Sequence, residues 1–140
     1  MEVASTRPML VSFRTLAFNG ENRAPATGNG AWTFELKQNI ELGLAVPTVA
    51  GGILQAIVKI TLGTDASSES DASHKASFHA EYEAKFDYPA SATEALVLPM
   101  FDQEPYQYVL VAQAFPLAMM YFRRELQSMG FDTRSLPLGM

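Results

Sequence analysis

The residues of this chain that most often carry out chemistry in proteins are two histidines and several closely spaced acids. His74 and His79 flank one alternating segment, and neither has a second metal ligand or a catalytic partner at a defined spacing. Glu81 and Glu83 share one side of an expected strand about 7 Å apart, as a solubilising stripe of carboxylates does. We therefore predict a solvated surface here, with neither a catalytic nor a metal centre.

Other motifs that could suggest a ligand site also lack its requirements. Asp65, Glu69 and Asp71 have neither the tight spacing nor the turn glycine of a calcium loop. Gly28–Gly30 precedes a strand, whereas phosphate-binding glycine loops open a helix. The chain has no cysteine, which excludes thiolate catalysis, disulfides and cysteine-ligated zinc. The sequence thus predicts no metal, no cofactor and no enzymatic activity.

Length and charge narrow the class of protein. A chain of 140 residues indicates one domain over 1–140, in which we expect residues 1–8 to be flexible. The net charge of -5 disfavours nucleic acid and anionic membranes as partners, because binding to phosphates needs clustered Lys or Arg. The N-terminus does not resemble a signal peptide, and no run of about 18 apolar residues predicts a membrane span.

The elements that position these residues are indicated by hydrophobic periodicity. Strict alternation of apolar and polar residues predicts strands over about 32–46, 53–64 and 76–88. A less regular alternation predicts a strand over 9–19, with a strand end or a bulge, followed by a turn at Asn19-Gly20. The polar segment 65–73 is expected to be a hairpin tip. One apolar face on each strand is typical of an antiparallel sheet covered on one side.

Residues 89–105 are expected to be an irregular, apolar crossover broken by Pro99, and a helix follows it. Residues 106–129 are apolar on two helix faces, so we expect burial on both sides, against the sheet and against a partner such as another subunit. Asp102 is the predicted N-cap and Gly130 the predicted stop. Pro116 predicts either a kink or a division into two helices. The predicted fold class is α+β, a four-stranded antiparallel sheet followed by a long kinked C-terminal helix.

The order of these elements and several residues resemble the SecB-type protein-export chaperones. The resemblance rests on Pro116 followed by Arg124-Glu125, on Met129 and Phe131, on the exit Leu136-Pro137-Leu138, and on Trp32-Thr33-Phe34-Glu35 in the second strand. It extends over roughly residues 9–138. The second C-terminal helix and acidic tail of that family have no counterpart in this sequence.

The resemblance implies a cytoplasmic, ATP-independent holdase that binds unfolded or nascent polypeptides and assembles as a dimer or tetramer. Apolar grooves bind extended, apolar chain segments, and flexible methionines suit such surfaces. The implied groove residues are Trp32, Phe34, Val97, Leu98, Met100 and Phe101. The implied core or subunit-interface residues are Phe115, Met119, Phe122 and Leu126.

The resemblance also bears on the partners of this protein. The family docks the export motor ATPase SecA on an acidic sheet surface, and the alignment keeps one such acid, Glu21, a candidate docking residue. Ala17 and Lys75 replace two others, which argues against docking to the motor. Protein export, toxin–antitoxin control and a phage role stay open. The alternative is a structural or assembly protein of the same fold with one dedicated partner.

Overall fold

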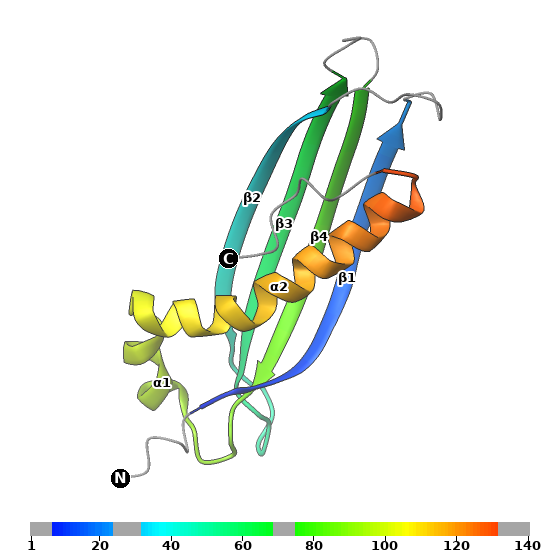
Figure 1. Cartoon of the computed structure of the whole chain (residues 1–140). Coiled ribbons are helices and arrows are strands. Elements are labelled where there is room, and N and C mark those ends of the chain that lie inside the picture. Colours follow the sequence, from blue (N-terminus) through cyan, green and yellow to red (C-terminus); the bar gives the residue numbers. More distant parts are fainter. Residues whose placement is uncertain (1–6, 24–31, 69–74, 132–140) are drawn as a thin grey trace.

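The fold consists of a four-stranded antiparallel sheet with a long helix across one of its faces and a short helix packed against the start of the long one (Figure 1). The computed structural model describes residues 7–23, 32–68 and 75–131. The strands are β1 (Met9–Asn22), β2 (Trp32–Ala45), β3 (Gln55–Ser68) and β4 (Lys75–Asp87), and the helices are α1 (Glu94–Phe101) and α2 (Glu104–Ser128). The strand order in the sheet is β1-β4-β3-β2, so β1 and β2 form the two edges. The predicted α+β class is confirmed.

The alternation seen in the sequence corresponds to the two faces of the sheet. Side chains of successive residues point to opposite faces of a strand, and on β3 and β4 the inward set is buried almost completely. Its members are Ala56, Val58, Ile60, Leu62, Thr64, Ala66, Ala76, Phe78, Ala80, Tyr82, Ala84 and Phe86. The apolar period of two in these segments therefore marks the face that packs on the helices.

β1 contains the irregularity that its weaker alternation predicts. Its register with β4 shifts between Leu10 and Ser12 and again between Thr15 and Ala17. Each shift inserts one residue, Val11 or Leu16, without an opposite partner, and both are exposed. A bulge of this kind bends an edge strand and increases its twist.

The predicted turn at Asn19-Gly20 is wrong, because both residues lie within β1. Gly20 pairs with Phe78 of β4 and has a packing role. A Cβ atom on Gly20 would lie 2.7 Å from Met129 Sδ and 2.8 Å from Phe78 Cδ1. The glycine therefore permits the close approach of the C-terminal end of α2 to the sheet.

The polar side of β4 also differs from the predicted stripe of solvated acids. Glu81 is exposed, but Glu83 is buried. Arg14 Nη2 of β1 lies 3.0 Å from Glu83 Oε1, and Lys85 Nζ lies 3.9 Å from the same oxygen. Two cations thus shield this carboxylate from water and link β4 to the edge strand β1.

The helices begin and end at residues that partly differ from the prediction. Residues 94–101, expected as an irregular crossover, form α1, whose N-cap Thr93 accepts a hydrogen bond at Oγ1 from Leu96 N at 3.4 Å. Asp102 follows α1 and is not the N-cap of α2. Gln103 has that position and makes no side-chain cap bond. Gly130, with a φ of 79°, ends the long helix as predicted.

α2 passes through Pro116 as one helix, so the proline does not divide it. Figure 1 shows a change of direction between its first half (yellow) and its second half (orange), which is the kink expected at a proline. α2 packs against β1, β3 and β4. Its C-terminal end is held by a hydrogen bond from Asn22 Nδ2 to the Met129 carbonyl at 3.1 Å and by the Phe131 ring against Phe78.

Two further expectations concern the ends of strands and membrane crossing. β3 continues to Ser68, so residues 65–68 belong to a strand and not to the predicted tip; residues 69–74 lie outside the described residues. The hairpin between β2 and β3 turns at Gly51, which has a φ of 79°. Neither described helix combines the length and the apolarity needed to cross a bilayer.

Candidate functional site

A cavity of about 450 Å³ lies between the start of β1, the end of α1 and the first half of α2. It is lined by Arg7, Pro8, Met100, Tyr106, Val109, Leu110 and Gln113. We call this cavity the α1–α2 groove. Its walls are apolar apart from one guanidinium, one phenol and one amide, so it suits an apolar side chain with polar neighbours.

The last turn of α1 and the first turn of α2 are fixed against each other beside the groove. Gln107 Nε2 donates a hydrogen bond to the Phe101 carbonyl at 2.9 Å, and the Phe101 and Tyr106 rings meet edge to face with centroids 6.2 Å apart. The Tyr106 hydroxyl also pairs with the Tyr88 hydroxyl at the end of the sheet. These contacts join α1, α2 and β4, so the groove wall is held by the core.

Burial affects the two phenols of this hydroxyl pair. It raises the pKa of Tyr88, and the hydrogen bond to Tyr106 raises it further. Burial also raises the pKa of Tyr106, although its bond to Tyr88 acts in the opposite direction. Both phenols are therefore neutral at physiological pH and serve as a fixed polar contact beneath an apolar surface.

The predicted groove residues divide into three groups. Leu98 is 45 % exposed and Met100 is partly exposed, and Met100 lines the groove. Val97 and Phe101 point into the core instead, at 0 % and 7 % exposure. The backbones of Trp32 and Phe34 lie in β2, but their side chains are outside the described part of the structure. The structure therefore brings Leu98 and Met100 to the surface and Val97 and Phe101 beneath it.

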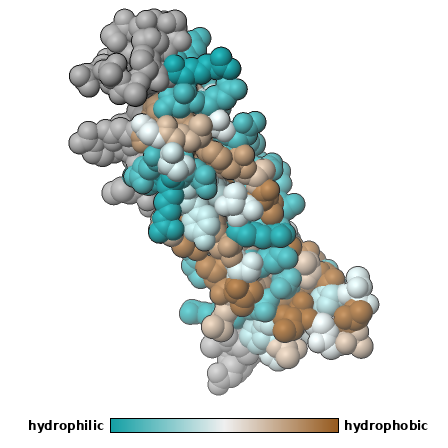
Figure 2. Space-filling view, turned by 90° about the vertical axis from the view of Figure 1, so that its right-hand side faces the viewer, coloured by the Kyte–Doolittle hydropathy of each residue, from teal (hydrophilic) through white to brown (hydrophobic). Residues whose placement is uncertain are grey.

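Sequence reasoning missed the contributions of Pro8 and of the first half of α2 to the groove. Tyr106 and Val109 belong to one apolar stripe of the helix, and the stripe does not distinguish buried from exposed turns. Val109 is 55 % exposed, and Leu96 on α1 and Tyr108 on α2 add exposed apolar side chains to the two helices that form the groove. Figure 2 shows apolar side chains gathered toward the lower end of the molecule, whereas hydrophilic ones dominate its upper end.

The remaining predicted residues lie away from the groove. Phe115, Met119, Phe122 and Leu126 are all buried in the core between α2 and the sheet. Glu21 is exposed on β1, with its Oε2 atom 3.4 Å from Arg23 Nε. His79 is exposed on β4, while His74, Glu69, Asp71 and the Gly28–Gly30 loop lie outside the described residues.

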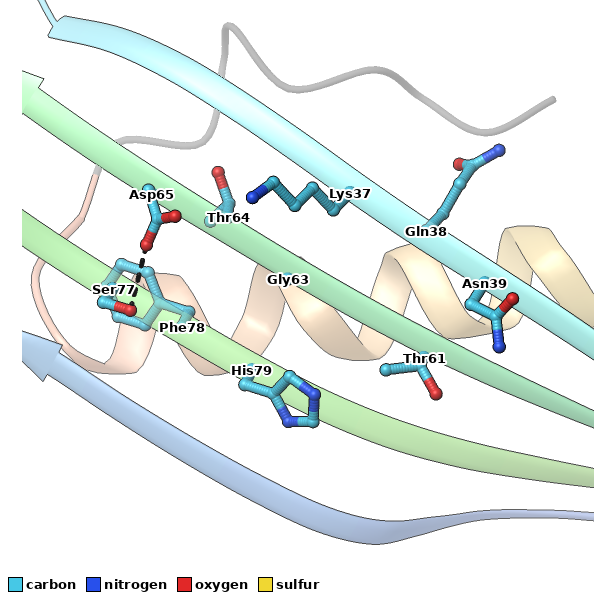
Figure 3. A pocket seen from close by; sticks show the side chains of 10 residues that line it. All are labelled: Lys37, Gln38, Asn39, Thr61, Gly63, Thr64, Asp65, Ser77, Phe78 and His79. Atoms are coloured by element: carbon cyan, nitrogen blue, oxygen red, sulfur yellow. Dashed lines mark hydrogen bonds between the residues drawn. The ribbon is translucent and has the colours of Figure 1, made fainter.

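A second, shallower depression of about 350 Å³ lies on the opposite, polar face of the sheet (Figure 3). Gly63 forms its floor, because it has no side chain between Lys37 of β2 and His79 of β4, its two cross-strand neighbours. Asp65 Oδ1 accepts a hydrogen bond from Ser77 Oγ at 3.2 Å at its rim. Across the described ranges, no three His, Asp or Glu side chains gather as a metal site requires.

The comparisons with known proteins concern the fold. No protein-family model matches the chain, and no curated protein matches it in sequence. This chain is similar, with a TM-score of 0.62, to a solved structure of the Mycobacterium tuberculosis Rv1957 SecB-like chaperone. That structure holds the chaperone in complex with a ChAD peptide from the Rv1956 HigA1 antitoxin. The fold is SecB-like. The match covers 99 % of this chain and 91 % of that chain at 15 % identity, so it establishes a shared fold and nothing finer.

Proposed function

We propose that this protein is an ATP-independent holdase that binds unfolded or nascent polypeptides, without catalysis or a cofactor. The observation that carries the proposal is the α1–α2 groove, an apolar cavity lined by Met100 and Val109, between two helices that also expose Leu98 and Tyr108. Large exposed apolar surface on a folded chain usually marks an interaction site. The SecB-like fold supports the proposal, since the solved structure with this fold holds a peptide.

The energetics favour weak binding of many different client segments. Removing apolar surface from water contributes about 25 cal/mol per Å². Association costs at least about 4 kcal/mol in lost freedom of motion, so a single apolar side chain in the groove cannot hold a client. The surrounding surface of Leu96, Leu98 and Tyr108 must contribute, and several grooves on one assembly would add to the affinity.

Assembly of several copies follows from the second apolar face of α2. Met120 is exposed and Leu117 is partly exposed on the second half of this helix, outside the groove lining, and they leave apolar surface uncovered in the isolated chain. We propose a homo-oligomer, either a dimer or a tetramer, acting in the cytoplasm. The setting is export or the control of a toxin–antitoxin pair. The antitoxin peptide bound by the similar structure favours the second, with the antitoxin as the client.

The test measures light scattering by a chemically unfolded protein diluted into buffer without ATP. The wild-type chain should suppress aggregation near stoichiometric ratios. The double variant Leu98→Asp with Val109→Asp should lose this suppression, because both side chains are exposed beside the groove and their replacement leaves the core intact. Val49→Asp, on the exposed loop between β2 and β3, is the control. Full suppression by a folded double variant would refute the groove as the client site.

A different observation favours the alternative, an assembly protein with one dedicated partner. The loop between β2 and β3 exposes Val46, Val49 and Ile53, and its turn is fixed by a hydrogen bond from Gly52 N to the Val49 carbonyl at 3.1 Å. A rigid apolar tip suits a fixed protein contact. On this alternative the wild type suppresses no aggregation, and Val49→Asp abolishes a stoichiometric complex that the groove variant retains.

A further inference from the structure

The α1–α2 groove has one charged residue in its lining, Arg7, at the start of β1. The side chain is exposed, and Arg7 has no ion pair with any residue that the structure describes. Arginine keeps its charge at every physiological pH. This side of the groove therefore presents an uncompensated positive charge to whatever occupies the cavity.

Two acids lie next in the chain to residues that line the groove. Asp102 follows α1 two residues after Met100, and Glu104, the first residue of α2, precedes Tyr106 by two. Both acids are exposed, and neither forms an ion pair within the described ranges. The last turn of α1 has no basic residue, so Asp102 adds to the negative end of that helix dipole.

On the basis of the proposed function, we infer that the α1–α2 groove selects client segments in which a bulky apolar residue has an acidic residue on one flank and a basic residue on the other. The apolar residue occupies the cavity beside Met100 and Val109. The acidic flank faces Arg7, and the basic flank faces Asp102 and Glu104. Such a pairing gives a bound segment a defined direction in a groove whose apolar contacts alone would accept either direction.

The expected selectivity is modest, because all three charges are exposed. Exposed ion pairs change an affinity by about 1.5-fold to 5-fold each. Two such pairs together predict a preference of roughly twofold to 25-fold for a segment with opposite flanking charges over one with two like charges. Salt should weaken this preference strongly, since exposed charges are screened beyond about 10 Å at 0.1 M ionic strength.

The experiment uses three capped, fluorescently labelled peptides with the same apolar core. The first has Asp and Lys on its two flanks, the second has two Asp, and the third has two Lys. Fluorescence anisotropy with the full chain should give the tightest binding for the Asp/Lys peptide, by roughly fivefold at low salt. The preference should disappear at 0.5 M NaCl.

Arg7→Glu provides the decisive variant, because it makes both sides of the groove acidic. It should reverse the order, so that the Lys/Lys peptide binds best. Arg124→Glu, an equal change of net charge on the exposed second half of α2, should leave the wild-type order unchanged. Equal binding of all three peptides, or an Arg124→Glu effect as large as that of Arg7→Glu, would overturn the inference while the holdase proposal stands. Failure of every peptide to bind would overturn both.

Discussion

The central strands β3 and β4 and the edge strand β2 have the same alternation of apolar and polar residues but very different burial. Ile60 and Leu62 of β3 are almost inaccessible to water, whereas Ile40 and Leu42 of β2 are only partly buried. Ile60 pairs directly with Ile40, so the two strands present the same face. The difference arises because α2 packs against β1, β3 and β4 and leaves β2 with less cover.

This comparison separates the part of the apolar surface that stabilises the fold from the part available for binding. A face fully covered by α2 contributes to the free energy of unfolding. Half-buried side chains on β2 and exposed side chains on α1 contribute less to the fold and can be covered further by another chain. Substitutions of the same residue type on neighbouring strands should therefore change the free energy of unfolding by very different amounts.

The largest effect is expected from truncation of Leu62. Leu62→Ala should lower the free energy of unfolding by about 2–5 kcal/mol, because it leaves a cavity under α2. Leu42→Ala, one strand away, should cost less than half as much, since that site is already partly open to water. Urea denaturation of both variants measures the difference. Equal losses would show that β2 is covered as fully as β3, and the comparison would fail.

A glycine pair gives a second contrast, between the two edge strands. Gly20→Ala on β1 should cost about 1–3 kcal/mol, because its Cβ would overlap Met129 and Phe78. Gly43 on β2 has no atom within 4 Å of such a Cβ. Gly43→Ala should therefore be neutral, or stabilising by a few tenths of a kcal/mol, since glycine weakens a strand interior. Thermal unfolding of the two variants tests this, and a neutral Gly20→Ala would refute the close approach of α2.

The smallest effect concerns pH. Burial raises the pKa of Tyr82 on β4 and of Tyr88, which follows that strand, so the folded chain keeps both phenols neutral where the unfolded chain ionises them. Their contribution to stability is therefore complete below about pH 10, the ordinary tyrosine value, and is lost as the pH rises above it. Urea midpoints at pH 8, 10 and 11 should fall over the upper interval. Tyr88→Phe should make this decline shallower, and an unchanged decline would contradict the assignment.

The sequence predicts the strands of the sheet more accurately than it predicts the short helix and the packing contacts around them. The alternation of Phe78, Tyr82 and Phe86 is a local property of β4, and it correctly gave the buried face. The structure of residues 94–101 was missed because Pro99 suggested an irregular segment, although Thr93 supplies a helix cap. The Asn19-Gly20 pair predicts a turn from local sequence alone. Its packing partner, Met129, lies more than a hundred residues further along the chain, so no local pattern reveals the packing role of Gly20.

The candidate site was harder to predict for a similar reason. Whether Val97 or Leu98 faces outward depends on how α1 packs against α2, and the composition of the segment does not reveal that direction. Arg7 and Pro8 enter the groove only because the strand that follows them, β1, pairs with β4. The groove is thus a product of tertiary contacts between distant segments, whereas the sheet faces are encoded in each strand.

Pro116 has a consequence for the motion of the long helix. Proline has no backbone N–H, so the Ala112 carbonyl lacks the rung of the hydrogen-bond ladder that would come from residue 116. Helix cooperativity is transmitted through such rungs. The angle between the two halves of α2 can therefore change at this point while the rest of the ladder stays intact, and buried Leu110 and Val111 keep the first half on the core. In mechanical terms, Pro116 is a hinge between two halves of one helix, each of which is held by buried side chains.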